Sequence, residues 1–170
     1  MKKMLLFLWL LLNGYNNVWS QTMTVDEARK VYAESMKNKE TCEIAYKRFS
    51  QVNDADKPLL VGYKGAVMVA MSKHLKTAKE KIAYFNEGKK LIEQSITEDN
   101  KNVELKFIRF TIQSNCPPAL KYNKEMSTDK KYIIDNLNDV KNVTIRLKIK
   151  DYLLQSTNIS QEEKQKLHDL

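Results

Sequence analysis

The sequence predicts an all-α domain of stacked antiparallel helices, and three observations support this prediction. Glycine and proline, which all-β folds use in their many turns, are scarce: the 170 residues include four and three of them. Apolar residues repeat at helical spacing over most of the chain. Threonine or serine followed three positions later by glutamate, the capping box of a helix N-terminus, precedes several of these repeats. We therefore expect about seven or eight helices joined by short polar loops.

Residues 1–20 predict a cleaved secretory signal. Two lysines follow the first methionine, Met4–Leu12 is an uninterrupted apolar run, and Val18–Ser20 provides a small-residue exit. The apolar run is much shorter than the roughly 20 residues that span a bilayer, so an uncleaved anchor is the weaker alternative. The prediction is therefore an exported protein, periplasmic or extracellular. Its single helical domain covers residues 21–170, with no stable membrane span after cleavage.

The charge of the chain argues against nucleic-acid binding. Two of the 29 Lys and Arg residues lie in the predicted signal, so its removal lowers the net charge from +8 to +6. Only four of the remaining basic residues are arginines, the side chain best suited to phosphates and base edges. We expect the lysines to form a solvated surface. Binding of anionic envelope polymers or lipid head groups is the alternative.

The individual helices follow from capping signals and apolar periodicity. Thr24 with Glu27 forms one capping box, and Thr77 with Glu80 forms a second. Pro58 suits the first turn of a helix. The expected helices cover about 24–36, 39–52, 58–74, 78–97, 103–114, 128–137 and 143–153, with a short final helix after Ser160.

Two further patterns need interpretation. Residues 103–107 and 143–149 alternate apolar and polar positions as strands do, yet both segments continue at helical spacing. We interpret both as helices. In the third expected helix, Gly62, Ala66 and Ala70 recur at every fourth position, which predicts that a neighbouring helix backbone approaches this face closely.

The segment 84–110 resembles a tetratricopeptide repeat. Gly88, Ile92 and Ser95 match the small, large and small positions of the second helix of that repeat. A broader likeness rests on Leu-Leu-Val-Gly-Tyr-Lys at 59–64, Tyr-Phe-Asn-Glu-Gly-Lys-Lys at 84–90 and Asn-Val-Glu-Leu-Lys-Phe-Ile-Arg-Phe at 102–110. By these motifs the chain resembles an uncharacterised family of small exported helical proteins of the Bacteroidota. The resemblance implies a right-handed tetratricopeptide-like array and implies no activity.

Cysteine and histidine residues indicate no catalytic or metal centre. Cys42 and Cys116 would be able to form a disulfide in an oxidising compartment. Helices stacked at about 8–10 Å would hold them too far apart, so Cys42 is more simply a small buried side chain, with the bridge as the alternative. His74 and His168 lack metal-ligand spacing with the cysteines, and no phosphate loop or nucleophile elbow occurs. We therefore expect no metal, no cofactor and no enzyme activity.

The remaining candidates are aromatic and basic residues of the middle helices. Core packing explains most of the aromatic ones, and the functional interpretation is a concave groove with a basic rim. The candidate groove residues are Tyr63, Lys64, Tyr84, Lys89, Lys106 and Arg109. We expect a non-enzymatic binding or scaffold module for an envelope protein or peptide, an acidic one if the lysines rim the groove. The alternative is a carrier or sensor of a small apolar or anionic envelope ligand held between helices.

Overall fold

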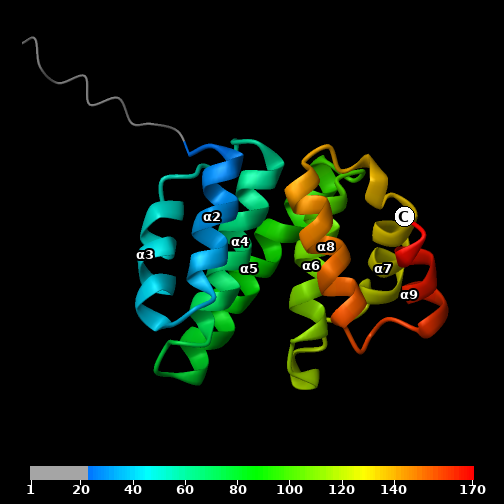
Figure 1. Cartoon of the computed structure of the whole chain (residues 1–170). Coiled ribbons are helices and arrows are strands. Elements are labelled where there is room, and N and C mark those ends of the chain that lie inside the picture. Colours follow the sequence, from blue (N-terminus) through cyan, green and yellow to red (C-terminus); the bar gives the residue numbers. More distant parts are fainter. Residues whose placement is uncertain (1–22) are drawn as a thin grey trace, which may run out of the picture.

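The computed structural model describes residues 23–170, and every regular element in this range is a helix (Figure 1). The predicted signal at 1–20 lies outside the described residues. The α-helices are α2 (Val25–Ser35), α3 (Lys39–Phe49), α4 (Pro58–Ser72), α5 (Ala78–Glu98), α6 (Val103–Ser114), α7 (Met126–Asp135), α8 (Val143–Gln155) and α9 (Gln161–His168). Two short 3₁₀ helices, η1 (Pro118–Leu120) and η2 (Leu137–Asp139), lie in the connections.

The helices form a stacked array in which consecutive α-helices run in alternating directions (Figure 1). One half of the array consists of α2 to α5 and the other of α6 to α9, and each half has its own apolar core. Helix α6 contributes to both cores. Leu105 and Ile108 belong to the first core, whereas Val103 and Phe110 belong to the second. The predicted all-α stack is confirmed, and α6 is the element that joins its halves.

Capping side chains fix most helix starts, as the sequence predicts. Thr77 and Ser160 each form a complete capping box with the glutamate three positions later. Thr24 accepts from the amide of Glu27, but the Glu27 carboxylate does not return to Thr24. It pairs instead with Arg48 of α3, so that half of the predicted capping box is wrong.

Both ambiguous segments are helices, and asparagine caps explain the outcome. The side chain of Asn102 accepts from the amide of Leu105 at the start of α6. Asn142 does the same for Ile145 at the start of α8. Each cap gives a free amide of the first helical turn a partner, which a strand would not provide. The alternating apolar positions are therefore the two sides of a helix that packs on more than one neighbour.

Two predicted boundaries are displaced. Helix α3 ends at Phe49 rather than near residue 52, and Val52 is buried beyond the helix end. Helix α7 begins and ends two residues earlier than predicted, and η2 follows it.

The closest helix contact joins α4 to α5 through two glycines. A Cβ added at Gly65 would lie 2.5 Å from the carbonyl oxygen of Gly88, and one added at Gly88 would lie 2.5 Å from that of Gly65. A Cβ added at Gly62, on the predicted small-residue face, would meet the side chain of Leu105 of α6 first, with Ser95 of α5 at 3.6 Å. Close approach was predicted on the face of Gly62, Ala66 and Ala70, but the tightest backbone contact is at Gly65, the residue before Ala66.

Candidate functional site

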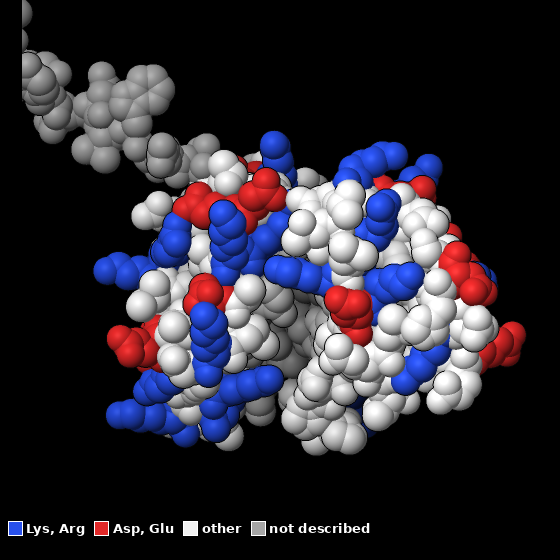
Figure 2. Space-filling model, viewed as in Figure 1, with Lys and Arg blue, Asp and Glu red and all other residues white. Residues whose placement is uncertain are grey.

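A pocket with a volume of about 730 Å³ lies between the two halves. Figure 2 shows a hollow at this place, with Lys and Arg side chains beside it. Helices α2, α4, α5, α6 and α8 and the segment after α6 supply its walls. The lining residues are Tyr32, Met36, Tyr63, Ala66, Val69, Ala70, Ser72, Lys73, Lys81, Ile82, Phe85, Phe107, Ile108, Thr111, Ile112, Asn115, Cys116, Pro117, Leu120 and Tyr152.

The pocket lies next to a close contact between α4 and α6. Gly62 lets the side chain of Leu105 approach the α4 backbone. One to two turns further along α4, the small side chains of Ala66 and Ala70 border the pocket, which Ile108 of α6 also lines. Small side chains on α4 thus leave a volume that larger ones would fill.

The lining is mainly apolar and carries only positive charge. Lys73 and Lys81 are its sole ionisable side chains charged at neutral pH, and no Asp or Glu lines it. In the described part of the chain neither lysine has an ion-pair partner. Burial raises the pKa of Tyr32 to about 12, so this hydroxyl stays protonated at neutral pH. The pocket is therefore an apolar space with two free cationic groups.

The polar groups of the wall are largely occupied by the protein itself. The hydroxyl of Tyr63 donates to Glu104 at 2.5 Å, and Glu104 also receives two hydrogen bonds from Arg29 at 2.6 and 2.8 Å. Asn115 donates to the carbonyl of Thr111 at 2.8 Å. The Tyr63–Glu104–Arg29 contacts join α4, α6 and α2 beside the pocket, and they hold its wall in place.

Both cysteines are free thiols. Cys42 is fully buried on α3, in line with its interpretation as a small apolar side chain, whereas Cys116 is half-buried and lines the pocket. Burial raises the pKa of both thiols, which disfavours the reactive thiolate. The two residues are not bridged, so the disulfide alternative has no support here.

The structure does not bring the six predicted groove residues into one groove. Tyr63 lines the large pocket. Lys64 lines a separate hollow of about 220 Å³, where its ammonium group lies 3.0 Å from Asp54. Tyr84 packs on Tyr46 beside that hollow, with ring centroids 5.6 Å apart. Lys89 lies over the ring of Tyr122 at 4.7 Å from its centroid.

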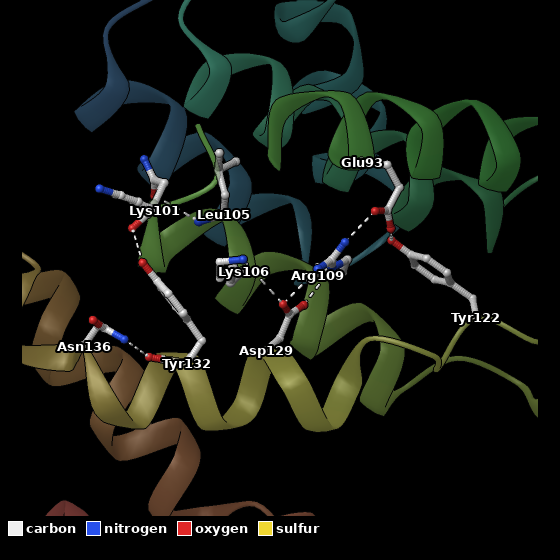
Figure 3. A network of polar contacts seen from close by, with 10 residues as sticks. Glu93, Lys101, Leu105, Lys106, Arg109, Tyr122, Asp129, Tyr132 and Asn136 are labelled. Atoms are coloured by element: carbon white, nitrogen blue, oxygen red, sulfur yellow. Dashed lines mark hydrogen bonds and ion pairs between the residues drawn. The ribbon is translucent and has the colours of Figure 1, made fainter. Parts of the chain in front are cut away.

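Lys106 and Arg109 lie on the side of α6 that faces α7, away from the pocket (Figure 3). Arg109 donates to both oxygens of Asp129 at 2.7 and 2.8 Å and to Glu93 at 2.5 Å. Tyr122 donates to the other Glu93 oxygen at 2.6 Å. Arg109 is therefore part of an internal ion-pair network and does not form the rim of a groove.

Sequence reasoning missed the pocket residues that lie outside the aromatic motifs, such as Lys73, Lys81 and Ile82. Lys73 and Lys81 flank the loop between α4 and α5, and only this placement in the sequence indicated that they lie at the same end of the molecule.

Residues 23–170 contain no group of three or more His, Cys, Asp or Glu that could hold a metal ion. None of the helices in this range has the length and apolar character to cross a bilayer.

No protein-family model, no curated protein and no solved structure matches the chain. The likeness to tetratricopeptide repeats and to the exported family of the Bacteroidota thus stays a prediction.

Proposed function

We propose that this protein is an exported, non-enzymatic binding protein that receives the apolar part of a ligand in the pocket between its halves. The observation that carries the proposal is the pocket itself. Its volume of about 730 Å³ falls within the roughly 300–1,000 Å³ of small-molecule sites, which are mostly apolar with a few polar groups. Of the two functions predicted from sequence, this favours the carrier or sensor over the peptide scaffold.

The composition of the pocket supports binding rather than catalysis. Its lining includes no carboxylate or imidazole that would act as a general base. The single lining thiol, Cys116, has a raised pKa and is therefore a weak nucleophile at neutral pH. Export is proposed from the signal pattern at 1–20 alone.

Binding of an environment-sensitive apolar dye to the purified domain tests the proposal, with two matched variants. Ile82 lines the pocket and Ile44 on α3 does not, and both side chains are about half exposed, at 49% and 55%. Ile82→Glu places a carboxylate at the pocket lip and should weaken dye binding at least tenfold, because an apolar ligand would have to desolvate it. Ile44→Glu should leave binding unchanged. Equal binding by both variants, or no binding by the wild type, would refute the proposed function.

A protein partner is the second candidate, favoured by a specific surface feature. Val143 and Leu147 lie one turn apart on α8 and are 54% and 52% exposed. Exposed apolar pairs at this spacing can receive the apolar face of a partner helix. Crosslinking in intact cells with the wild type and Leu147→Glu separates the candidates. A partner recovered only with the wild type supports the scaffold, and failure to recover a repeatable partner removes it.

A further inference from the structure

We infer that the ligand of this pocket is a long-chain amphiphile with an anionic head group, held by Lys73 and Lys81 while its chain lies among the apolar side chains. The inference rests on the proposed function and names the ligand class. It depends on three features of the pocket: the sign of its charge, the free state of both lysines, and the change from buried to exposed lining residues at the end of α4.

The charge of the pocket is entirely positive. Twenty residues line it, and among them Lys73 and Lys81 are the only charged ones. Some other lysines of the described residues pair with carboxylates, as Lys64 does with Asp54 and Lys130 with Glu163, whereas Lys76 and Lys79, like the two pocket lysines, do not. No described carboxylate pairs with Lys73 or Lys81, so a ligand anion would be their first ionic partner.

The positive charge of Lys73 also acts on the thiol of Cys116, another residue that lines the pocket. Burial raises the pKa of the Cys116 thiol, while the positive charges of Lys89 and Lys73 oppose this rise. Lys73 therefore lies near enough to the pocket wall to favour a negative charge there. A ligand head group placed at the same edge would be stabilised by the same charges.

The lining residues of α4 are buried as far as Ser72, and the exposed lysines lie beyond the end of that helix. At one end Tyr63, Ala66 and Ile108 are nearly fully buried. At the other end Lys73 and Lys81 are exposed. Lys73, the C-cap of α4, lies ten positions after Tyr63, which corresponds to about 15 Å along the helix. An apolar chain that fills the buried end would thus reach the lysines with its head group.

Lysine pairs bind a range of anions, since an ammonium group is a point charge without the planar fork of arginine. Carboxylate and phosphate head groups share this chemistry, and they would come from free fatty acids or from lysophospholipids. We propose only the feature that these ligands share, an anionic head group on a single apolar chain. The experiment tests a fatty acid and a lysophospholipid separately.

Isothermal titration of the purified domain with laurate, lauryl alcohol and a lauroyl lysophosphatidic acid tests the inference. Lys73→Gln/Lys81→Gln should weaken laurate binding by roughly three- to twentyfold, with lauryl alcohol unaffected, because exposed ion pairs contribute modestly. Lys76→Gln/Lys79→Gln is the matched control: it removes the same charge from the same region, the end of α4 to the first turn of α5, at residues that do not line the pocket. This control should bind laurate like the wild type. A longer chain should bind about fourfold tighter per methylene until the buried end is full.

The outcomes separate the inference from the proposed function. Equal affinity of the wild type for laurate and lauryl alcohol, or equal losses in the two lysine variants, would overturn the anionic head group and leave the apolar pocket intact. If none of the three ligands binds, the proposed function fails as well. Preference for the phosphate over laurate, lost in Lys73→Gln/Lys81→Gln alone, supports the inference and identifies a lysophospholipid as the source.

Discussion

Individual buried ions determine how the central helices pair. Asp129 of α7 is fully buried and receives two hydrogen bonds from Arg109 of α6, which also binds Glu93 of α5. Glu104 of α6 is nearly fully buried, and it accepts hydrogen bonds from Arg29 of α2 and from the hydroxyl of Tyr63 on α4. Such groups are costly to bury alone, so each one specifies a particular neighbour.

Asp129→Asn should destabilise the domain strongly. The substitution leaves the buried Arg109 guanidinium without its main counter-charge, and breaking a buried pair in this way costs about 3–5 kcal/mol. Asp135→Asn on the same helix is the control, because the exposed Asp135 pairs with Lys131 and Lys166 at the surface. Urea unfolding should show a large loss for the first variant and a small one for the second. Similar losses for both would contradict the structural role given to Arg109.

Alkaline pH should unfold the domain through its buried tyrosines. Burial, followed by contacts with Glu104 and Glu93 respectively, raises the pKa of Tyr63 and Tyr122 above the ordinary tyrosine value. A raised folded-state pKa means that stability is intact below the unfolded-state value of about 10 and falls as pH rises above it. Tyrosinate absorbance should therefore increase in two stages, the second together with loss of helical circular dichroism. If all tyrosines ionise in a single stage at the ordinary tyrosine pKa while the domain stays folded, the burial of Tyr63 and Tyr122 is contradicted.

At the scale of helices, local sequence signals predict where a helix begins better than where it ends or which other helices it contacts. Thr77 and Ser160 act through amides three residues away, so their capping is contained in a short stretch of sequence. The end of α3 depends on how Val52 enters the core after the helix, and this requires the whole fold. The partners of Arg109 lie 16 and 20 positions away. A single sequence does not specify these partners, because many carboxylates are available at such distances.

The pocket also could not be predicted from the sequence, because it too depends on contacts between distant helices. Its volume depends on how α4 and α6 pack beyond the contact of Gly62 with Leu105, and helix periodicity does not specify how two helices pack. The groove prediction placed Arg109 at a rim because the residue lies between aromatic positions in the sequence. In the folded helix α6, Arg109 faces α7, whereas Ile112 faces the pocket.

Gly65→Ala should destabilise the pairing of α4 with α5. Alanine is the better helix former by about 1 kcal/mol, so propensity alone predicts a gain. The added methyl would meet the backbone carbonyl of Gly88, which cannot rotate away, and we expect a net loss of about 1–3 kcal/mol. Gly62→Ala is the comparison, because it meets the end of the flexible Leu105 side chain and should cost less. Thermal unfolding measures both, and a more stable Gly65→Ala would show that the helices can separate without cost.

At the scale of the whole molecule, the two cores share α6, and a pocket lies between the two halves. This arrangement gives a ligand contact with both halves at once. Bound ligand should therefore stabilise the fold as a whole, since it binds the native state and not the unfolded chain.

Export is tested by the N-terminus of the protein recovered from its native host. The signal pattern predicts cleavage after Ser20, so N-terminal sequencing should begin at or near Gln21. A protein recovered from the cytoplasm with Met1 and both following lysines intact would contradict the proposed compartment.

The central claim, that the pocket between the halves binds an apolar ligand, is tested most directly by an amide NMR titration of the domain with laurate. We predict saturable shifts concentrated at lining residues such as Val69, Phe107 and Ile112, with Ile44 on α3 unaffected. Shifts confined to the exposed Val143 and Leu147 of α8, or no saturable shifts at all, would contradict the claim.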